Sequence, residues 1–101
     1  MLAYNLQWKK SATKELTDIP KEYSTKIFKE ISNLAEIPRP DGCRKLTGTI
    51  NLYRIKINEY RVIYSIEDNI LTIEIIRIAH RKDAYRNLNK KIKSQKTLFS
   101  K

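Results

Sequence analysis

Residues 51–64, NLYRIKINEYRVIY, constrain the fold of this chain most strongly, because apolar and cationic side chains alternate within them. Successive residues of a β-strand point to opposite faces of a sheet, so this period of two predicts strands at about 52–57 and 60–67. Asn58 and Glu59 lie between the strands and predict a tight turn. The stretch is therefore expected to form a β-hairpin with one apolar and one cationic face.

The same period assigns the side chains of this hairpin to two faces. Arg54, Lys56 and Arg61 fall on the face opposite to the apolar residues. Helices cover the apolar face of such a sheet, so the three cations are expected on a face that stays open to a ligand. A lone cation on an exposed strand is ordinary, but three on one face indicate a binding surface. The apolar set consists of Tyr53, Ile55, Ile57, Tyr60, Val62, Tyr64 and Ile66.

The segments on either side of the hairpin predict an α+β fold of order β-α-α-β-β-β-α. A small, twisted, mainly antiparallel sheet would carry a helical pair on one face, and one domain would span residues 1–101. Residues 94–101 are expected to be frayed. The other predicted elements are a strand at 2–8, a short helix with Ser11 as its N-cap, an amphipathic helix through Tyr23, Ile27, Ile31 and Leu34, a loop at 38–42, a strand at 71–79 and a C-terminal helix over 80–93.

The last predicted strand changes phase partway along. Leu71, Ile73 and Ile75 alternate with polar neighbours, whereas Ile76 and Ile78 have the opposite parity. Either a β-bulge near residues 75 and 76 or a central strand that is buried on both faces explains this pattern.

A second polar group follows this strand directly. His80, Arg81 and Tyr85 are expected at the end of the sheet and close to the cationic face. Arg, Lys, His and Tyr side chains together can bind phosphodiesters and stabilise a developing negative charge. They can also cleave RNA without a metal: a base removes the 2′-OH proton, the oxygen attacks the adjacent phosphate, and an acid protonates the leaving 5′-oxygen.

The charge of the chain also indicates a polyanionic partner. The formal net charge is +10 and the sequence pI is ≈ 9.8. The excess is +3 over residues 1–50 and +7 over residues 51–101, the half that contains the hairpin. Such a balance is typical of nucleic-acid-binding proteins, although it also keeps a small protein soluble.

Several chemistries are excluded by the residue content. The single Cys43 allows no internal disulfide and no cysteine metal cluster, and His80 is the only histidine. There is no HExxH motif, no CxxC motif and no glycine-rich phosphate loop, so we expect neither a metal nor a cofactor. No apolar stretch resembles a signal peptide or a membrane span, which predicts a cytoplasmic protein without a membrane partner.

Three segments resemble the RelE branch of the RelE/ParE toxin superfamily. They are KLTG at 45–48, YRIKINEYRVIY within the hairpin, and IRIAHRKDAYR at 76–86, and the resemblance extends over nearly all of residues 2–88. It implies a single RelE-like toxin domain, the toxin of a type II toxin–antitoxin pair. Similar toxins enter the ribosomal A site and cut the mRNA codon there without a metal. The implied partners are a cognate antitoxin, the ribosome with its mRNA and 16S rRNA, and DNA indirectly through the antitoxin complex.

The resemblance also implies roles for individual residues. Either Lys56 or His80 would act as the general base, Arg61 and Arg81 would stabilise the phosphate in the transition state, and Tyr85 would stack on a base or transfer a proton. Some family members have a lysine at the position of the arginine at 54, and an arginine is a poor base. The implied substrate-binding residues are Arg54, Lys45, Lys82 and Arg86.

Three rival functions stay open at this point. A ParE-like toxin shares the fold but inhibits DNA gyrase and is not a nuclease. A non-catalytic RNA- or DNA-binding module would use the same cations only to hold phosphates. A structural ribosome-associated protein would also be basic and small.

Overall fold

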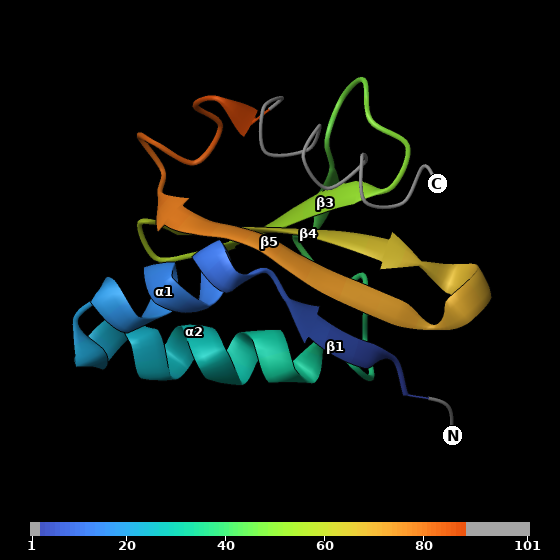
Figure 1. Cartoon of the computed structure of the whole chain (residues 1–101), viewed down its shortest axis with the longest axis horizontal. Coiled ribbons are helices and arrows are strands. Elements are labelled where there is room, and N and C mark those ends of the chain that lie inside the picture. Colours follow the sequence, from blue (N-terminus) through green and yellow to red (C-terminus); the bar gives the residue numbers. More distant parts are fainter. Residues whose placement is uncertain (1–2, 89–101) are drawn as a thin grey trace.

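We describe residues 3–88 of a computed structural model of the chain. Five strands form one sheet in the order β1-β5-β4-β3-β2, in which β1 is parallel to β5 and the other neighbours are antiparallel. Figure 1 shows both helices against one face of this sheet. The elements are β1 Asn5–Trp8, α1 Lys10–Asp18, α2 Lys21–Asn33, β2 Arg44–Lys45, β3 Leu52–Ile57, β4 Tyr60–Glu67, the 3-10 turn η1 Asp68–Ile70 and β5 Thr72–His80.

The main core lies between the sheet and the helices, as the alternation predicts. From α2, Ile27 and Ile31 are fully buried in this core. Every second residue of the hairpin meets them, including Ile55 on β3 and Val62 on β4. Burying such aliphatic side chains is the main favourable term in the free energy of folding. The predicted apolar face of the hairpin is therefore confirmed as the helix-facing side of the sheet.

The phase change in the last strand is explained by a β-bulge. Ile63 pairs with Arg77 and Tyr64 pairs with Ile75, so Ile76 is an extra residue on β5. A single extra residue reverses the parity of the strand, which lets residues on both sides of the bulge face the helices. Ile73 and Ile75 before the bulge and Ile78 after it all belong to the same core.

The helix starts differ from the sequence expectation in one detail. The N-cap of α1 is Lys9, which makes no side-chain capping bond, so the prediction of Ser11 as the cap is wrong. α2 begins after Pro20, where the missing N–H of proline leaves no helical hydrogen bond unmade. The Glu15 carboxylate of α1 accepts a hydrogen bond from the backbone N–H of Ile78, at 2.8 Å. That bond ties α1 to β5 beyond the end of β1.

The chain after β5 does not continue as the predicted helix at once. Residues 81–87 form successive turns above the sheet face that the helices leave uncovered. Figure 1 shows this segment and loop 46–51 on the same side of the sheet. The rest of the predicted helix, 89–93, and the tail expected to be frayed lie outside the described residues. Within residues 3–88, no helix combines the length and apolar character needed to span a membrane.

Candidate functional site

Two cross-strand pairs put cations on the sheet face opposite the helices, which we call the cationic face (Arg44, Arg54, Lys56 and Arg61). Lys56 on β3 is the register partner of Arg61 on β4, and Arg54 on β3 is the partner of Arg44 on β2. Directly opposed residues of an antiparallel pair share one face, with Cβ atoms about 4.5–5.5 Å apart. Like charges in that arrangement destabilise a sheet. These opposed cations therefore carry an electrostatic cost that a bound anion would relieve.

The cations of this face bond to main-chain oxygens or to nothing among residues 3–88. Arg54 Nη1 donates to the carbonyl of Gly42 at 3.3 Å. Arg61 Nη1 donates to the carbonyls of Asn58 at 3.1 Å and Tyr60 at 3.0 Å. Lys56 has no hydrogen-bond or ion-pair partner in the described part of the chain. The carbonyls orient the two guanidinium groups without neutralising them, so their remaining N–H donors stay available for a phosphate.

The β3–β4 turn brings a further arginine to this end of the sheet. Arg81 Nε lies 2.8 Å from Glu59 Oε1, and the backbone N–H of Arg81 donates to the Glu59 carbonyl at 2.7 Å. Asn58 in the same turn has a positive φ of 55°, a conformation that asparagine tolerates better than most residues. Arg61 on β4 also bonds to this turn, at the Asn58 carbonyl. The turn is therefore a common partner of Arg61 and of Arg81, which follows β5.

Arg77 supports the segment that carries Tyr85. Its Nη1 donates to three carbonyls, those of Asp83 at 3.5 Å, Ala84 at 2.8 Å and Arg86 at 2.5 Å. The register partner of Arg77 is Ile63, and Ile63 follows Val62, which faces the helices, so Arg77 projects from the opposite side of β5. Ala84 is fully buried, whereas the Tyr85 side chain is 46% exposed and open to a ligand. Sequence reasoning left the role of Arg77 ambiguous, because nothing local indicated that carbonyls six to nine residues ahead would be its partners.

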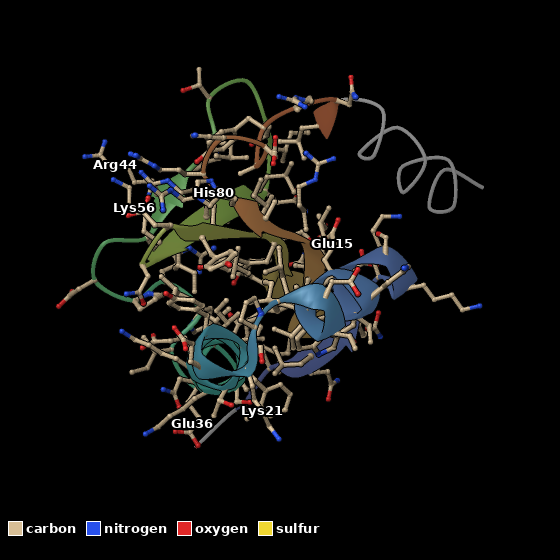
Figure 2. The ribbon with its side chains drawn as sticks, turned by 90° about the vertical axis from the view of Figure 1, so that its left-hand side faces the viewer. Glu15, Lys21, Glu36, Arg44, Lys56 and His80 are labelled. Atoms are coloured by element: carbon tan, nitrogen blue, oxygen red, sulfur yellow. The ribbon has the colours of Figure 1, made fainter. Side chains whose placement is uncertain are left out.

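His80 lies at the end of the sheet, as the sequence predicts, but its register places it on the face opposite to the cations. Its register partner is Tyr60, and the two rings make an edge contact with centroids 6.0 Å apart. Tyr60 packs in turn against Tyr23 of α2 at 5.6 Å. The imidazole therefore lies on the helix-facing side at the tip of β5, not on the cationic face, and its Nδ1 accepts a hydrogen bond from the Lys82 backbone N–H at 3.2 Å. Figure 2 looks onto this end of the sheet, with His80 at the tip of β5 and Arg44 and Lys56 toward the β2–β3 edge.

The register between β2 and β3 places Arg44 on the cationic face in place of the predicted substrate-binding residue Lys45. Lys45 pairs with Tyr53, whose ring packs against the helix-side core, so Lys45 has the wrong parity for the cationic face. Arg44 takes that place instead. The two-residue strand β2 is too short to show a period, so the sequence alone could not distinguish these neighbours. Of the other two predicted binding residues, Lys82 is exposed in the turns after β5, and Arg86 lies 3.4 Å from Asp83 in the same turns.

Comparisons with known proteins agree with this arrangement. The sequence model of a family described as "ParE toxin of type II toxin-antitoxin system, parDE" matches residues 6–85. A Methanocaldococcus jannaschii protein that bears the name toxin RelE1 is 30% identical over 91 residues, which cover 85% of this chain and 99% of that protein. The chain belongs to the RelE/ParE toxin superfamily. The resemblance seen in the sequence is thereby confirmed.

Solved RelE structures share the fold of this RelE/ParE chain. RelE in the archaeal RelE–RelB complex from Pyrococcus horikoshii is 30% identical, with a TM-score of 0.72 over 82% of this chain and 100% of that one. RelE in the intact E. coli RelBE toxin–antitoxin complex is 26% identical, with a TM-score of 0.69 over 77% of this chain and 96% of that one. The predicted α+β architecture is therefore that of RelE-like toxins. Within residues 3–88, no group of three or more His, Cys, Asp or Glu side chains is placed to hold a metal ion.

Proposed function

We propose that this chain is the toxin of a type II toxin–antitoxin pair and a ribosome-dependent endoribonuclease that cuts mRNA in the ribosomal A site. The observation that carries this proposal is the pair Lys56–Arg61 on the cationic face, where neither side chain has a carboxylate partner among the described residues. Cations whose N–H donors are unengaged can bind the phosphodiester of an RNA that reaches this open face of the sheet.

Lys56 is the better placed of the two candidate bases. It shares a face and a cross-strand pair with Arg61, whereas His80 contacts Tyr60 on the other side of the sheet. In its neutral form, Lys56 would take the proton from the 2′-OH, and the oxygen would attack the adjacent phosphorus. The bond from phosphorus to the 5′-oxygen then breaks, which leaves a 2′,3′-cyclic phosphate on one fragment and a 5′-OH on the other.

The remaining residues would stabilise charge and orient the RNA. Arg61 and Arg81 each bond to a residue of the β3–β4 turn, and both would bind the phosphate oxygens as negative charge accumulates on them. Tyr85 would stack on a base of the codon or protonate the leaving 5′-oxygen. All of these groups are side chains of the chain itself, so the reaction as proposed requires no metal.

The partners follow from the same proposal. Two of the similar solved structures are described as RelE in complex with RelB, an antitoxin, so we infer an antitoxin partner for this chain as well. A net charge of +10 suits both an acidic antitoxin and the ribosome with its rRNA. DNA contact would come only through the antitoxin complex, and the site of action is the cytoplasm.

Gyrase inhibition is a second candidate, because the matching family model describes ParE toxins. Both candidates can be tested in one cell-free translation reaction on a defined mRNA, followed by primer extension. A-site nuclease action predicts cuts at the codon in the A site that disappear when ribosomes are omitted. Arrested translation with intact mRNA would sink the nuclease proposal, and poisoned gyrase in a supercoiling assay would favour the second candidate.

A further inference from the structure

Glu59 is an acidic residue within a cationic site. It is the only acid between Asp41 and Glu67, in the segment that supplies all the residues of the cationic face. A carboxylate beside a phosphate-binding site repels the phosphate, because like charges a few ångströms apart interact strongly even near a protein surface. The position of Glu59 therefore indicates a role that offsets this repulsion.

Glu59 bonds to Arg81 through both its side chain and its main chain. Glu59 Oε1 lies 2.8 Å from Arg81 Nε, and the Glu59 carbonyl accepts from the Arg81 backbone N–H at 2.7 Å. Figure 1 shows the β3–β4 turn beside the end of β5, which Arg81 follows. The side chains of Arg81 and Glu59 are 58% and 61% exposed, so their ion pair adds little to the stability of the fold. What the pair does determine is where the guanidinium lies.

The bond to Glu59 leaves free the part of Arg81 that a phosphate needs. It occupies Nε–H, whereas the two Nη groups of Arg81 make no hydrogen bond within residues 3–88. The guanidinium is planar, so a bond at Nε and a fixed backbone together set the direction in which both Nη groups point. The carboxylate and a phosphate can therefore use different donors of one side chain. A lysine would have to serve both anions from a single ammonium group.

The same turn also orients Arg61. The carbonyls of Asn58 and Tyr60, on either side of Glu59, accept from Arg61 Nη1 at 3.1 and 3.0 Å. With the Glu59 carbonyl, three consecutive carbonyls bond to the two arginines that are proposed to bind the phosphate. The Asn58 side chain accepts from Lys26 Nζ of α2 at 3.3 Å, which ties the turn to the helical layer. The turn is therefore a common support that sets the two arginines relative to each other.

We propose that Glu59 is a positioning residue that holds the Arg81 guanidinium by its Nε–H and directs the Nη groups to the phosphate of bound RNA. Glu59 acts through Arg81, keeps this bond while RNA is bound, and takes no part in proton transfer. As a role in cleavage, the proposal rests on the nuclease function proposed above. The bond itself can be measured without any cleavage.

The spectroscopic test follows the Nε–H signal of Arg81 by NMR of the full chain, assigned through its loss in Arg81→Lys. In the unmodified chain this proton should lie downfield of its position in Glu59→Met and exchange with water more slowly, because it is held in a charge-assisted hydrogen bond. A single-stranded DNA oligonucleotide, which carries phosphates but no 2′-OH, should leave this shift in place. A signal that is the same in both proteins, or that moves to its Glu59→Met position when the oligonucleotide binds, would overturn the proposal.

The cleavage test compares Glu59→Met with Glu59→Gln in single-turnover reactions on ribosomes with a defined A-site codon. At saturating ribosomes Glu59→Met should cut about tenfold more slowly, because a misplaced donor stabilises the transition state less well. The half-saturating ribosome concentration should change by less than about twofold, since one phosphate contact is a small part of ribosome binding. Glu59→Gln keeps an oxygen that accepts from Nε–H, so its rate should return to within about threefold of the unmodified chain.

Two results of this comparison would overturn the proposal. If Glu59→Gln is as slow as Glu59→Met, the carboxylate transfers a proton and does not merely hold Arg81. If either variant cuts faster than the unmodified chain, the main effect of the carboxylate is to repel RNA.

Two further variants show whether Glu59 acts through Arg81. In an Arg81→Ala background, Glu59→Met should cost less than about twofold, because the side chain that it positions is already gone. The full loss in that background would overturn the proposal. Glu36→Met is the matched control, since Glu36 is an exposed acid that lies below the helical layer in Figure 2, and it should cut as the unmodified chain does. If it is as slow as Glu59→Met, the effect comes from net charge and the proposal is wrong.

The positioning role and the nuclease can fail separately. If the unmodified chain cuts no mRNA on the ribosome, but the Nε–H signal depends on Glu59 and persists with the oligonucleotide bound, the nuclease is wrong and the support of Arg81 by Glu59 stands. If Glu59→Met cuts mRNA at the normal rate, the nuclease stands and the positioning role is wrong.

Discussion

The cations at the two ends of β4 differ in their bonding partners. At the end of β4, Arg39 Nη2 lies 3.0 Å from Asp68 Oδ2, and its guanidinium stands 5.0 Å from the centroid of the Tyr53 ring. The Tyr4 hydroxyl donates to the other oxygen of Asp68 at 2.6 Å. We call these four residues the Arg39 cluster. At the start of β4, Arg61 bonds only to main-chain carbonyls, and Lys56 has no partner in the described part of the chain.

The difference shows in the ionisation of the Arg39 cluster. Hydrogen bonds from Arg39 and then from Tyr4 lower the pKa of the Asp68 carboxyl below its ordinary value of 3.8. The bond to Asp68 also raises the pKa of the Tyr4 hydroxyl.

The Arg39 guanidinium, whose donors are used by the Asp68 carboxylate and the Tyr53 hydroxyl, is expected to contribute to folding. The exposed Arg81–Glu59 pair engages only Nε of Arg81 within residues 3–88, so the other donors of Arg81 stay available for a phosphate. Under the proposed function, cations that face one another without such partners bind RNA, so the variants below should separate stability from activity.

Removal of the unpartnered lysine should have the largest effect. Lys56→Ala should slow single-turnover cleavage of A-site mRNA by about 10²–10³-fold, because a general base is lost. His80→Ala should lower the rate by less than about tenfold, since the imidazole lies with Tyr60 on the other side of the sheet. Circular dichroism on both variants checks that the fold is kept. A larger loss in the histidine variant would assign the base to His80 and reverse our choice.

Removal of the support under the turns after β5 should have an intermediate effect. Arg77→Met keeps the aliphatic length but loses three bonds to carbonyls of residues 83–86, so Tyr85 should be misplaced and cleavage should fall about tenfold. Because Arg77 acts through Tyr85, the same change in a Tyr85→Ala background should cost less than about twofold. Equal losses in both backgrounds would mean that Arg77 has only a general structural role.

The salt dependence of RNA binding should show a smaller contrast. Arg54→Gln removes a phosphate contact on the cationic face, which should reduce the slope of log K against log salt by about 0.7 for single-stranded RNA. Arg39→Gln should leave the slope unchanged, because the Arg39 guanidinium is already engaged by Asp68. Fluorescence anisotropy with a labelled oligonucleotide measures both slopes. A common decrease in the two variants would mean that RNA responds only to total charge.

The smallest effect is expected on the pH dependence of stability. Since the folded-state pKa of Asp68 is lowered, its contribution is fully present above the unfolded value and is lost as the pH falls through the folded value. Asp68→Asn should therefore have a lower Tm than the unmodified chain at pH 7, and the gap should shrink at about pH 3. Thermal unfolding at the two pH values tests this. A gap that is as wide in acid as at neutral pH would contradict the ionic role of Asp68.

The sequence predicts those parts of the fold that depend on period and local turns. The hairpin at 51–64 and its apolar face were accessible, because alternation is a property of neighbouring residues. The phase change beside Ile76 was visible too, but only the pairing of β4 with β5 selects a bulge over a strand that is buried on both faces. The parallel pairing of β1 with β5 was not, because it joins segments that are far apart in the chain. β2 escaped prediction since two residues show no period.

The candidate site was predictable to the same extent, and its prediction failed for the same reasons. Arg54, Lys56 and Arg61 follow from alternation within one hairpin. The position of His80 depends on how the bulge resets the face of β5, which the sequence left open between two explanations. The choice of Arg44 over Lys45 depends on register, and the partners of Arg77 depend on the path of the chain after β5. Tertiary contacts decide all three.

The most direct test of the central claim is a paired assay of Arg61→Ala and Arg39→Ala in cell-free translation with primer extension. Arg61→Ala removes an arginine from the cationic face, and Arg39→Ala removes one from the Arg39 cluster. The two variants therefore change the net charge equally. Arg61→Ala should lose A-site cleavage by about 10²–10³-fold while its Tm changes little. Arg39→Ala should cut mRNA normally and have a lower Tm. Equal cleavage by the two variants would contradict the assignment of activity to the cationic face.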